Sequence, residues 1–311
     1  MTPFGESAAL VPAGPQSAEI ASLWWFFFAL AALVYVGVLV ALVLALTRGE
    51  QPADQRRRRL VVGVATAVTA LALLTLLGRS VLAGKALAGL DATATLEVEV
   101  IGHQWWWEFQ YRADPPSQRV TTANELHLPV GQAVRLVLQS RDVIHSFWVP
   151  ALHGKRDLIP GHPSTTTIRA DRPGVYRGQC AEFCGAQHAH MGFLVFAEPP
   201  ADFQRWLDQQ RRTAAEPGLA QVRRGREVFL RGSCVLCHTV AGTPAGASNG
   251  PDLTHLASRH TLAAGTLPNV HDRLRTWVRD APALKPGVRM PPNRLPDDEL
   301  DPLVRYLESL Q

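Results

Sequence analysis

The segment between Cys180 and Met191 concentrates side chains that bind soft metals. It runs Cys180-Ala-Glu-Phe-Cys184-Gly-Ala-Gln-His188-Ala-His-Met191, so two thiols, an imidazole and a thioether follow one another at spacings of four, four and three residues. Such ligands suit copper far better than magnesium or calcium. His145, further upstream, supplies a second imidazole. Two cysteines, two histidines and a methionine are too many soft ligands for one blue-copper ion. They are the right number for two copper ions bridged by two thiolates.

Two other chemistries use cysteines at this spacing. A disulfide between Cys180 and Cys184 would leave the neighbouring histidine and methionine unexplained. A zinc site is the second alternative, but zinc is bound by cysteine, histidine and carboxylates, and methionine is not among its usual ligands. Copper is therefore the preferred interpretation.

A second pair of cysteines lies in the last third of the chain. Cys234-Val-Leu-Cys237-His238 is the attachment pattern of a c-type haem. The chain has four cysteines, so each one has an expected cofactor role and none remains for a structural disulfide. Methionine is equally sparse, because only Met191 and Met290 follow the initial residue. A core that used methionine as a gap-filler would contain more of them.

Hydrophobic residues gather near the N-terminus, which indicates a membrane anchor. Residues 23–46 are 24 positions without a charge, long enough to cross a bilayer, and residues 60–82 form a second apolar stretch. The loop at 48–59 contains five arginines, which places it on the cytoplasmic side. Both termini then lie outside, in the compartment where c-type haem is attached. We expect a two-pass protein of the bacterial inner membrane, in contact with lipid, with its soluble domains on the periplasmic face.

The net charge and the composition of residues 1–21 each lead to one further expectation. The net charge of +4 comes partly from the run 56–59, so the total gives no reason to expect nucleic-acid binding. Residues 1–21 contain no lysine or arginine and therefore lack the positive start of a signal peptide. The chain either inserts by its first span or carries a presequence that is processed.

From residue 95 onward the apolar pattern changes to a period of two. Several short strands separated by Pro and Gly turns predict a β-sandwich or barrel. A helix follows at 199–216, and Glu216-Pro-Gly218 breaks the chain. Further helices are predicted at 219–231, 269–280 and 297–310. Pro302 should move the start of the last helix to its own position, with Asp301 as the cap.

The motifs of the two soluble regions resemble those of two protein families. His145, the 180–191 segment, Gly102-His-Gln-Trp-Trp-Trp and Arg172-Pro-Gly-Val-Tyr-Arg-Gly-Gln together resemble cytochrome c oxidase subunit II with its binuclear copper (CuA) loop. The region after 218 resembles a class I cytochrome c, as fused to subunit II in caa-type oxidases. Its matching pieces are Gly250-Pro-Asp-Leu-Thr-His255, Ala263-Ala-Gly-Thr-Leu-Pro-Asn269, Leu284-Lys-Pro-Gly287 and Arg289-Met-Pro-Pro292.

The resemblance implies a multidomain membrane protein: a two-helix transmembrane hairpin, a cupredoxin-like β-sandwich and an all-α class I cytochrome c domain. The expected parts are an extracytoplasmic segment at 1–21, the hairpin at 22–90, the copper domain at 91–198, a helix and linker at 199–218, and the cytochrome c domain at 219–311.

For the copper site, the resemblance implies that Cys180 and Cys184 bridge both ions. It assigns His145 and Met191 to one copper, and His188 with the backbone carbonyl of Glu182 to the other. The Glu182 side chain matches the family's ligand to a magnesium ion at the interface with subunit I.

For the haem site, Cys234 and Cys237 would form the thioethers and His238 the proximal ligand. Met290 is the expected distal ligand, and His/Met ligation raises the reduction potential. His255, His260 and His271 are the alternatives, and we read them as surface residues. The resemblance makes Trp105 the electron-transfer residue at the copper site. Trp106 and Trp107 are expected in an aromatic belt at the membrane surface.

The function implied is that of an electron-transfer subunit in a proton-pumping cytochrome c oxidase. Electrons would pass from cytochrome c or another periplasmic donor to haem c, to CuA, and on to haem in subunit I, where oxygen is reduced. Subunit III is a further expected partner. The alternatives are the copper subunit of a related nitric oxide reductase and, ranked lower, a copper chaperone or assembly protein.

Overall fold

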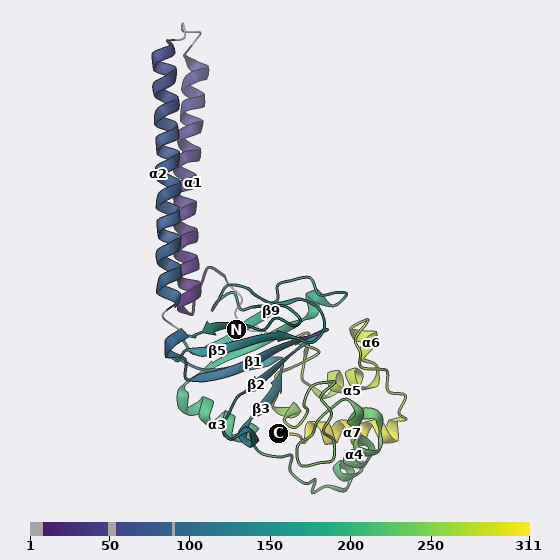
Figure 1. Cartoon of the computed structure of the whole chain (residues 1–311). Coiled ribbons are helices and arrows are strands. Elements are labelled where there is room, and N and C mark those ends of the chain that lie inside the picture. Colours follow the sequence, from purple (N-terminus) through teal and green to yellow (C-terminus); the bar gives the residue numbers. More distant parts are fainter. Residues whose placement is uncertain (1–8, 49–53, 89–90) are drawn as a thin grey trace.

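The computed structural model describes residues 9–48, 54–88 and 91–311, and two long helices stand out from the rest of the molecule (Figure 1). Helices α1 (Pro15–Thr47) and α2 (Gln55–Ala88) run side by side, and both are long and apolar enough to cross a membrane. Their large apolar side chains point outward all around the pair. That pattern is typical of helices surrounded by lipid. Both helices extend beyond the apolar stretches that predicted them.

The first turn of α1 is attached to the β domain. The side chain of Gln16 donates to the carbonyl of Thr167 at 2.7 Å, and the hydroxyl of Ser17 donates to the carbonyl of Ala151 at 2.7 Å. Both polar side chains are buried. These contacts explain why the helix begins eight residues before the apolar stretch at 23, with Pro15 suited to a first helical position.

Two sheets form a sandwich below the hairpin. Within the described residues, one sheet has the order β3–β2–β1–β5–β8 and the other β4–β10–β9–β6–β7. The β1–β5 and β4–β10 pairs are parallel, and the other pairs are antiparallel. The strands of the first sheet are β1 (Leu96–His103), β2 (Trp106–Tyr111), β3 (Val120–Ala123), β5 (Val134–Ser140) and β8 (Ser164–Ile168). Those of the second are β4 (Glu125–Pro129), β6 (His145–Trp148), β7 (Arg156–Leu158), β9 (Gly174–Cys180) and β10 (Gly192–Glu198).

The core between the sheets corrects one expectation. Trp107 is fully buried, and its ring packs against Phe147 and Phe193 with centroid separations of 6.1 and 5.2 Å. Trp106 stacks on the ring of His103 at 4.2 Å. Neither tryptophan belongs to a membrane belt. Because alternate residues of a strand face opposite sides, Trp107 points into the core.

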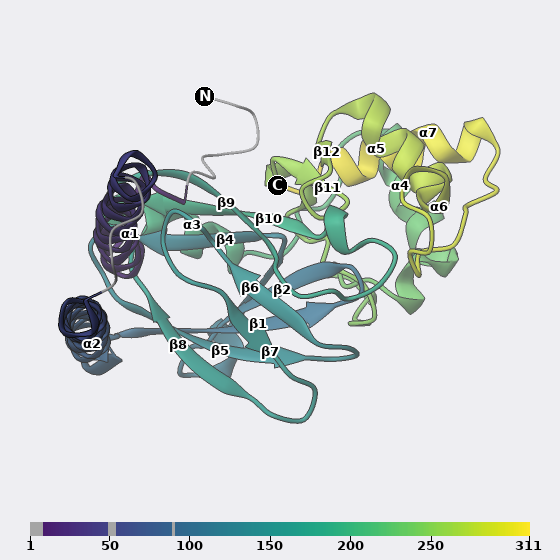
Figure 2. The same cartoon turned by 90° about the horizontal axis from the view of Figure 1, so that it is seen from above.

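Helix α3 (Pro200–Gln210) closes the end of the sandwich, where the ring of Trp206 stacks on that of His127 at 3.9 Å. A second, helical domain follows beside the sandwich and away from the hairpin (Figures 1 and 2). It has its own apolar core. Its elements are α4 (Ala220–Arg231), β11 (Thr261–Leu262), β12 (Leu267–Pro268), α5 (His271–Arg279), α6 (Ala281–Leu284) and α7 (Asp297–Glu308).

The last helix does not begin at Pro302, as predicted, but at Asp297. Pro302 lies inside α7 and is buried with Leu300 and Leu303. Loss of one backbone hydrogen bond is tolerated because this face packs closely on α4. A Cβ on Gly225 of α4 would lie 1.9 Å from the Pro302 carbonyl oxygen. Burial of the apolar face thus outweighs the local cost of proline.

Candidate functional site

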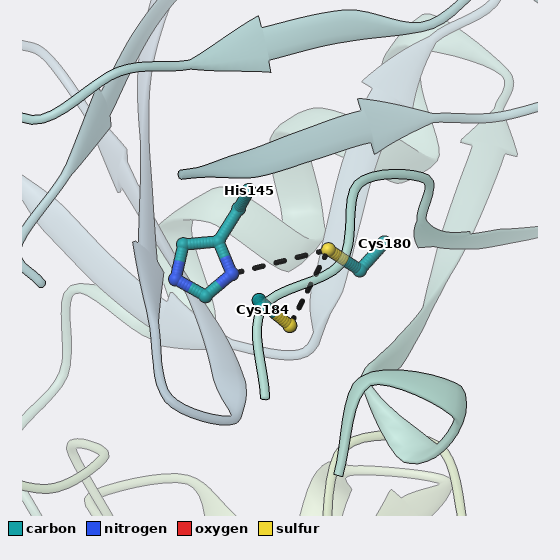
Figure 3. Close-up of side chains that lie close together, drawn as sticks. All are labelled: His145, Cys180 and Cys184. Carbon is teal, nitrogen blue, oxygen red and sulfur yellow. Dashed lines mark hydrogen bonds between the residues drawn. The ribbon is translucent and has the colours of Figure 1, made fainter. Parts of the chain in front are cut away.

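The sandwich brings the expected copper ligands together at one end. His145 is the first residue of β6 and Cys180 the last of β9, and these two strands pair with Phe147 opposite Cys180. The loop from β9 to β10 then carries Cys184, His188 and Met191 back to the same point. Figure 3 shows the His145 ring and the Cys184 sulfur side by side, both facing the Cys180 sulfur.

The distances within this cluster suit a shared metal centre. The sulfurs of Cys180 and Cys184 lie 3.8 Å apart. That is less than twice a thiolate–metal bond of about 2.3 Å, so one ion can contact both sulfurs. Each sulfur also has an imidazole beside it: Nδ1 of His145 lies 3.9 Å from Cys180 Sγ, and Nδ1 of His188 lies 3.7 Å from Cys184 Sγ.

Two further donors complete the set, one a thioether and one a carbonyl oxygen. The sulfur of Met191 lies 3.9 Å from that of Cys184, and the carbonyl oxygen of Glu182 lies 3.2 Å from the Cys180 sulfur. Both cysteines and Met191 are buried. The arrangement places the two sulfurs at the centre, with a histidine and one further donor next to each.

The thiols must lose protons before they can bind a metal. A hydrogen bond between the two side chains lowers the pKa of Cys180, and the same contact raises the pKa of Cys184. The pair therefore loses its first proton readily and its second with difficulty. The positive charge of a bound metal would supply the force that removes the second proton.

Asp142 fixes the ring of His145, a role that the sequence reasoning missed. Its Oδ1 lies 2.9 Å from Nε2 of His145, which leaves Nδ1 turned toward Cys180. Against the effect of burial, hydrogen bonds from His145 and from the backbone of Gln104 lower the pKa of Asp142 to about 2. A carboxylate behind a metal-binding histidine is a common way to set ring orientation. Its position three residues before His145 was the available signal.

Trp105 contacts the copper loop directly. Its Nε1 donates to the carbonyl of Cys184 at 2.9 Å, and the side chain of Gln104 donates to the same carbonyl at 2.8 Å. A Cβ on Gly185 would lie 2.9 Å from the Trp105 ring. Glycine at 185 thus permits the close approach, and its φ of +114° is one that other residues rarely adopt.

A cavity of about 550 Å³ lies between the helical domain and the sandwich. Its walls include the expected haem residues Cys234, Cys237, His238 and Met290. Trp105 and Trp106, from the sandwich, line it as well. The volume lies in the range of cofactor sites. One wall of the expected haem site is therefore made by the copper domain.

His238 is prepared to bind iron. Its Nδ1 lies 2.7 Å from the carbonyl of Pro251, which leaves Nε2 as the free nitrogen. Burial lowers the pKa of His238 and favours the neutral ring that metals bind. A Cβ on Gly250 would lie 2.7 Å from this ring, so glycine makes room for it.

Two buried donors in the cavity wall support an anionic ligand there. Within the described residues, Nε of Arg259 and Oγ1 of Thr261 are buried without a hydrogen-bond partner. Unpaired buried donors are costly. The propionate carboxylates of a haem would satisfy both, so the residues present fit that group.

The alternative distal histidines are held elsewhere. His255 is buried, contrary to the expectation, and its Nε2 lies 3.1 Å from the carbonyls of Gln210 and Arg212. His260 contacts Glu125, and His271 lies 2.8 Å from Glu308. Of the four candidates for the distal ligand, Met290 is the one in the cavity lining.

The magnesium expectation at Glu182 gains no support. Its carboxylate faces Lys155 at 3.9 Å and accepts from the Phe183 backbone at 3.1 Å. Across the described residues, the metal-type cluster of acidic, histidine and cysteine side chains comprises His145, Cys180 and Cys184 and includes no carboxylate.

Comparison with known proteins identifies both soluble parts. The family described as cytochrome c oxidase subunit II, periplasmic domain, matches residues 115–197, and the cytochrome c family matches residues 222–311. The chain thus contains a domain of the cytochrome c oxidase subunit II periplasmic family, followed by a cytochrome c domain. Members of this domain family hold CuA, and cytochrome c domains hold haem c.

Two bacterial proteins named cytochrome c oxidase subunit 2 are similar to this chain in sequence. The protein of Alkalihalophilus pseudofirmus is 38% identical over 219 residues, which cover 70% of this chain and 62% of the relative. That of Bacillus sp. PS3 is 32% identical over 228 residues, covering 70% and 63%. The matched region thus spans slightly less than two thirds of each relative's length.

A solved structure gives a partial match. The periplasmic domain of subunit II of cytochrome oxidase from Bradyrhizobium japonicum is 29% identical, with a TM-score of 0.36, and the match covers 38% of this chain and 94% of that one.

Proposed function

We propose that this chain is the electron-transfer subunit of a membrane-bound terminal cytochrome c oxidase. It receives electrons from cytochrome c or another periplasmic donor at a covalent haem c and passes them to a binuclear CuA centre. From there they go to haem in subunit I, where oxygen is reduced and protons are pumped. Partner subunits I and III complete the complex.

One observation carries this proposal. The ring of Trp105 lines the expected haem cavity and also donates a hydrogen bond to the carbonyl of Cys184 at 2.9 Å. A single side chain therefore connects the two cofactor sites. An external protein cannot occupy the same face of Trp105 while the cytochrome domain covers it, so electrons enter through the haem.

The residues assigned to each cofactor are those that the family resemblance implies, and their clustering supports the assignment. Cys180 and Cys184, with His145, His188, Met191 and the Glu182 carbonyl, would hold the copper pair. Cys234 and Cys237 would attach the haem, and His238 and Met290 would ligate its iron. The copper pair would supply a one-electron site that reorganises little, and the buried sandwich ends would hold its donors rigidly. A labile site, as in a copper chaperone, would have no use for this rigidity.

The hairpin sets the location. Both soluble domains lie at one end of α1 and α2, opposite the end where Arg48 follows α1 and the run 56–59 forms the first turns of α2 (Figure 1). By the positive-inside rule, the arginine end is cytoplasmic and the soluble domains are periplasmic. The protein thus belongs to the bacterial inner membrane.

Replacement of Trp105 by Phe in the purified native complex tests the proposal. The variant loses the indole N–H that binds Cys184, and we expect haem-to-copper electron transfer to slow by about tenfold, a barrier of about 1.4 kcal/mol. Trp206→Phe, in α3 and outside the cavity wall, is the matched control and should leave the rate nearly unchanged. Both should keep two coppers per haem by metal analysis.

An unchanged rate in Trp105→Phe would overturn the route, and one copper per haem would overturn the binuclear site. The same preparation, supplied with reduced cytochrome c, should consume oxygen. Consumption of nitric oxide instead would assign the chain to the reductase branch.

A further inference from the structure

The segment that leads to Met290 also contacts the copper loop. Lys285 follows α6 directly, and its side chain is buried at 2% exposure between the two domains. Pro286, the next residue, accepts a hydrogen bond from the Gln187 side chain of the copper loop at 2.8 Å. Arg289 lies 3.5 Å from Asp142, the carboxylate behind His145. A stretch of five residues therefore touches the copper domain repeatedly before it supplies the haem ligand.

Lys285 uses all of its donors in this interface. Its ammonium nitrogen lies 3.0 Å from the carbonyl of Trp105, 2.7 Å from that of His190 and 3.0 Å from that of Ala263. An ammonium has three N–H donors, so each one has a partner.

The three carbonyls belong to three functional segments. Trp105 is the residue between the haem cavity and the copper loop. His190 lies between the copper donors His188 and Met191, and Ala263 belongs to the haem domain. Lys285 therefore joins the haem domain, the copper loop and the tryptophan at a single nitrogen atom.

Stability alone does not explain this arrangement, because burying the Lys285 ammonium is unfavourable. Burial lowers the pKa of Lys285 to about 7, because the charged form loses its hydration. An apolar side chain of similar volume would avoid that loss, and buried charges are often replaceable in this way without loss of stability. What the directed hydrogen bonds add is orientation, since those to the Trp105 and His190 carbonyls cross the interface and form at one relative position of the domains.

The turn at Ala263 and Ala264, which contacts Lys285, has an unfavourable backbone conformation. Ala263 and Ala264 have φ angles of +52° and +58°, a left-handed conformation that costs alanine roughly 1–2 kcal/mol. In this conformation the Ala263 carbonyl faces Lys285, and the Ala264 carbonyl accepts from the backbone N–H of Gly192 at 3.0 Å. Both carbonyls of the strained turn thus serve the domain interface.

We propose that Lys285 is a positioning residue that locks the cytochrome domain onto the copper domain, with the haem cavity against Trp105. This role rests on the proposed electron-transfer function. It predicts that loss of the lysine loosens the interface and slows electron transfer between the domains, while each cofactor keeps its own site.

The test compares Lys285→Met and Lys285→Gln with the wild type in the intact complex. Methionine keeps much of the apolar stem and removes all three donors, and glutamine retains N–H groups on a shorter side chain. After rapid photoreduction of the haem, we expect transfer to copper to slow by at least about tenfold in Lys285→Met and by less in Lys285→Gln. Arg273→Met, which removes an exposed cation of α5, is the control and should match the wild type.

Three further readouts separate positioning from general damage. Haem and copper potentials and contents should match the wild type. Hydrogen exchange should quicken by at least about fivefold in peptides that contain the Gly192 and His260 amides, because both N–H groups bond across the interface. Equal exchange in wild type and Lys285→Met would overturn the inference and leave the Trp105 route intact. Faster exchange with an unchanged transfer rate would overturn both the positioning role and the route.

Discussion

The copper site and the haem cavity are built in different ways. Every expected copper donor comes from the sandwich, at the ends of paired strands and in one loop, and the ring of His145 is oriented within the same domain by Asp142. The haem cavity is shared, because Trp105 and Trp106 form part of its wall while the haem-attachment residues come from the helical domain. The copper site therefore depends on the folding of one domain. Electron transfer between the two sites depends on how the two domains pack together.

The largest effect should come from removing a bridging sulfur. In Cys180→Ser, a hydroxyl replaces the thiolate, and the soft ligand shared by both ions is lost. We expect copper to fall from two ions to at most about one per chain, and oxidase activity to fall by at least about a hundredfold. Metal analysis and oxygen uptake measure both.

Covalent haem content is the internal control, because the helical domain has its own core. Full haem with depleted copper would support the separation of the two sites. Loss of haem together with copper would show that the copper domain must fold first for haem to be attached.

A smaller effect is expected behind the copper site, at Asp142. In Asp142→Asn the side chain keeps its shape but loses the charge that faces His145. Replacement of such outer partners commonly costs about 10–100-fold in metal affinity. Copper retention during dialysis against a graded chelator measures this loss. Asp157→Asn, on exposed β7, provides a charge-matched control. Equal retention in both variants would mean that the copper donors need no orienting carboxylate.

The smallest effect concerns the domain interface and pH. His260 of the helical domain lies 3.6 Å from Glu125 of β4, and the hydrogen bond with Glu125 raises the pKa of His260. Glu198 acts in the same direction, and the buried Arg259 also faces Glu125. A raised pKa means that the docked state gains stability below pH of about 6.5 and loses it as pH rises through the raised value.

Because the His260 side chain is 59% exposed, the gain should be below about 1 kcal/mol. Lys285, whose pKa burial lowers to about 7, also titrates in this range in both proteins. Relative to His260→Gln, the wild type should therefore lose slightly more exchange protection of the Gly192 peptide between pH 6 and 8, after correction for intrinsic rates. The variant keeps the backbone N–H at 260, which bonds to Glu125 at 2.6 Å in the wild type. An identical pH profile in both proteins would remove His260 from the interface.

Local sequence patterns predicted the elements well where burial and pattern agree. The alternation around Trp105 to Tyr111 predicted a strand, and β2 occupies Trp106–Tyr111. Short strands without a strong pattern, such as β3 and β7, were not predicted. Their pairing comes from neighbours far along the chain, so no local signal marks them. Pro302 led to a wrong prediction of where the last helix begins. The energetic cost of a proline inside α7 is small compared with the packing of α7 on Gly225.

The sequence by itself determined the chemistry. Ligand type and spacing identified a copper loop and a haem attachment site, because metals select side chains by their softness and number. Tertiary structure alone decided how the sites communicate. Lys285 lies far along the chain from Trp105 and His190, and its role depends on the carbonyls that these two residues contribute from the other domain. The loop of sulfur and imidazole ligands from Cys180 to Met191 thus forms one side of an interface, and the haem cavity lies on the other side.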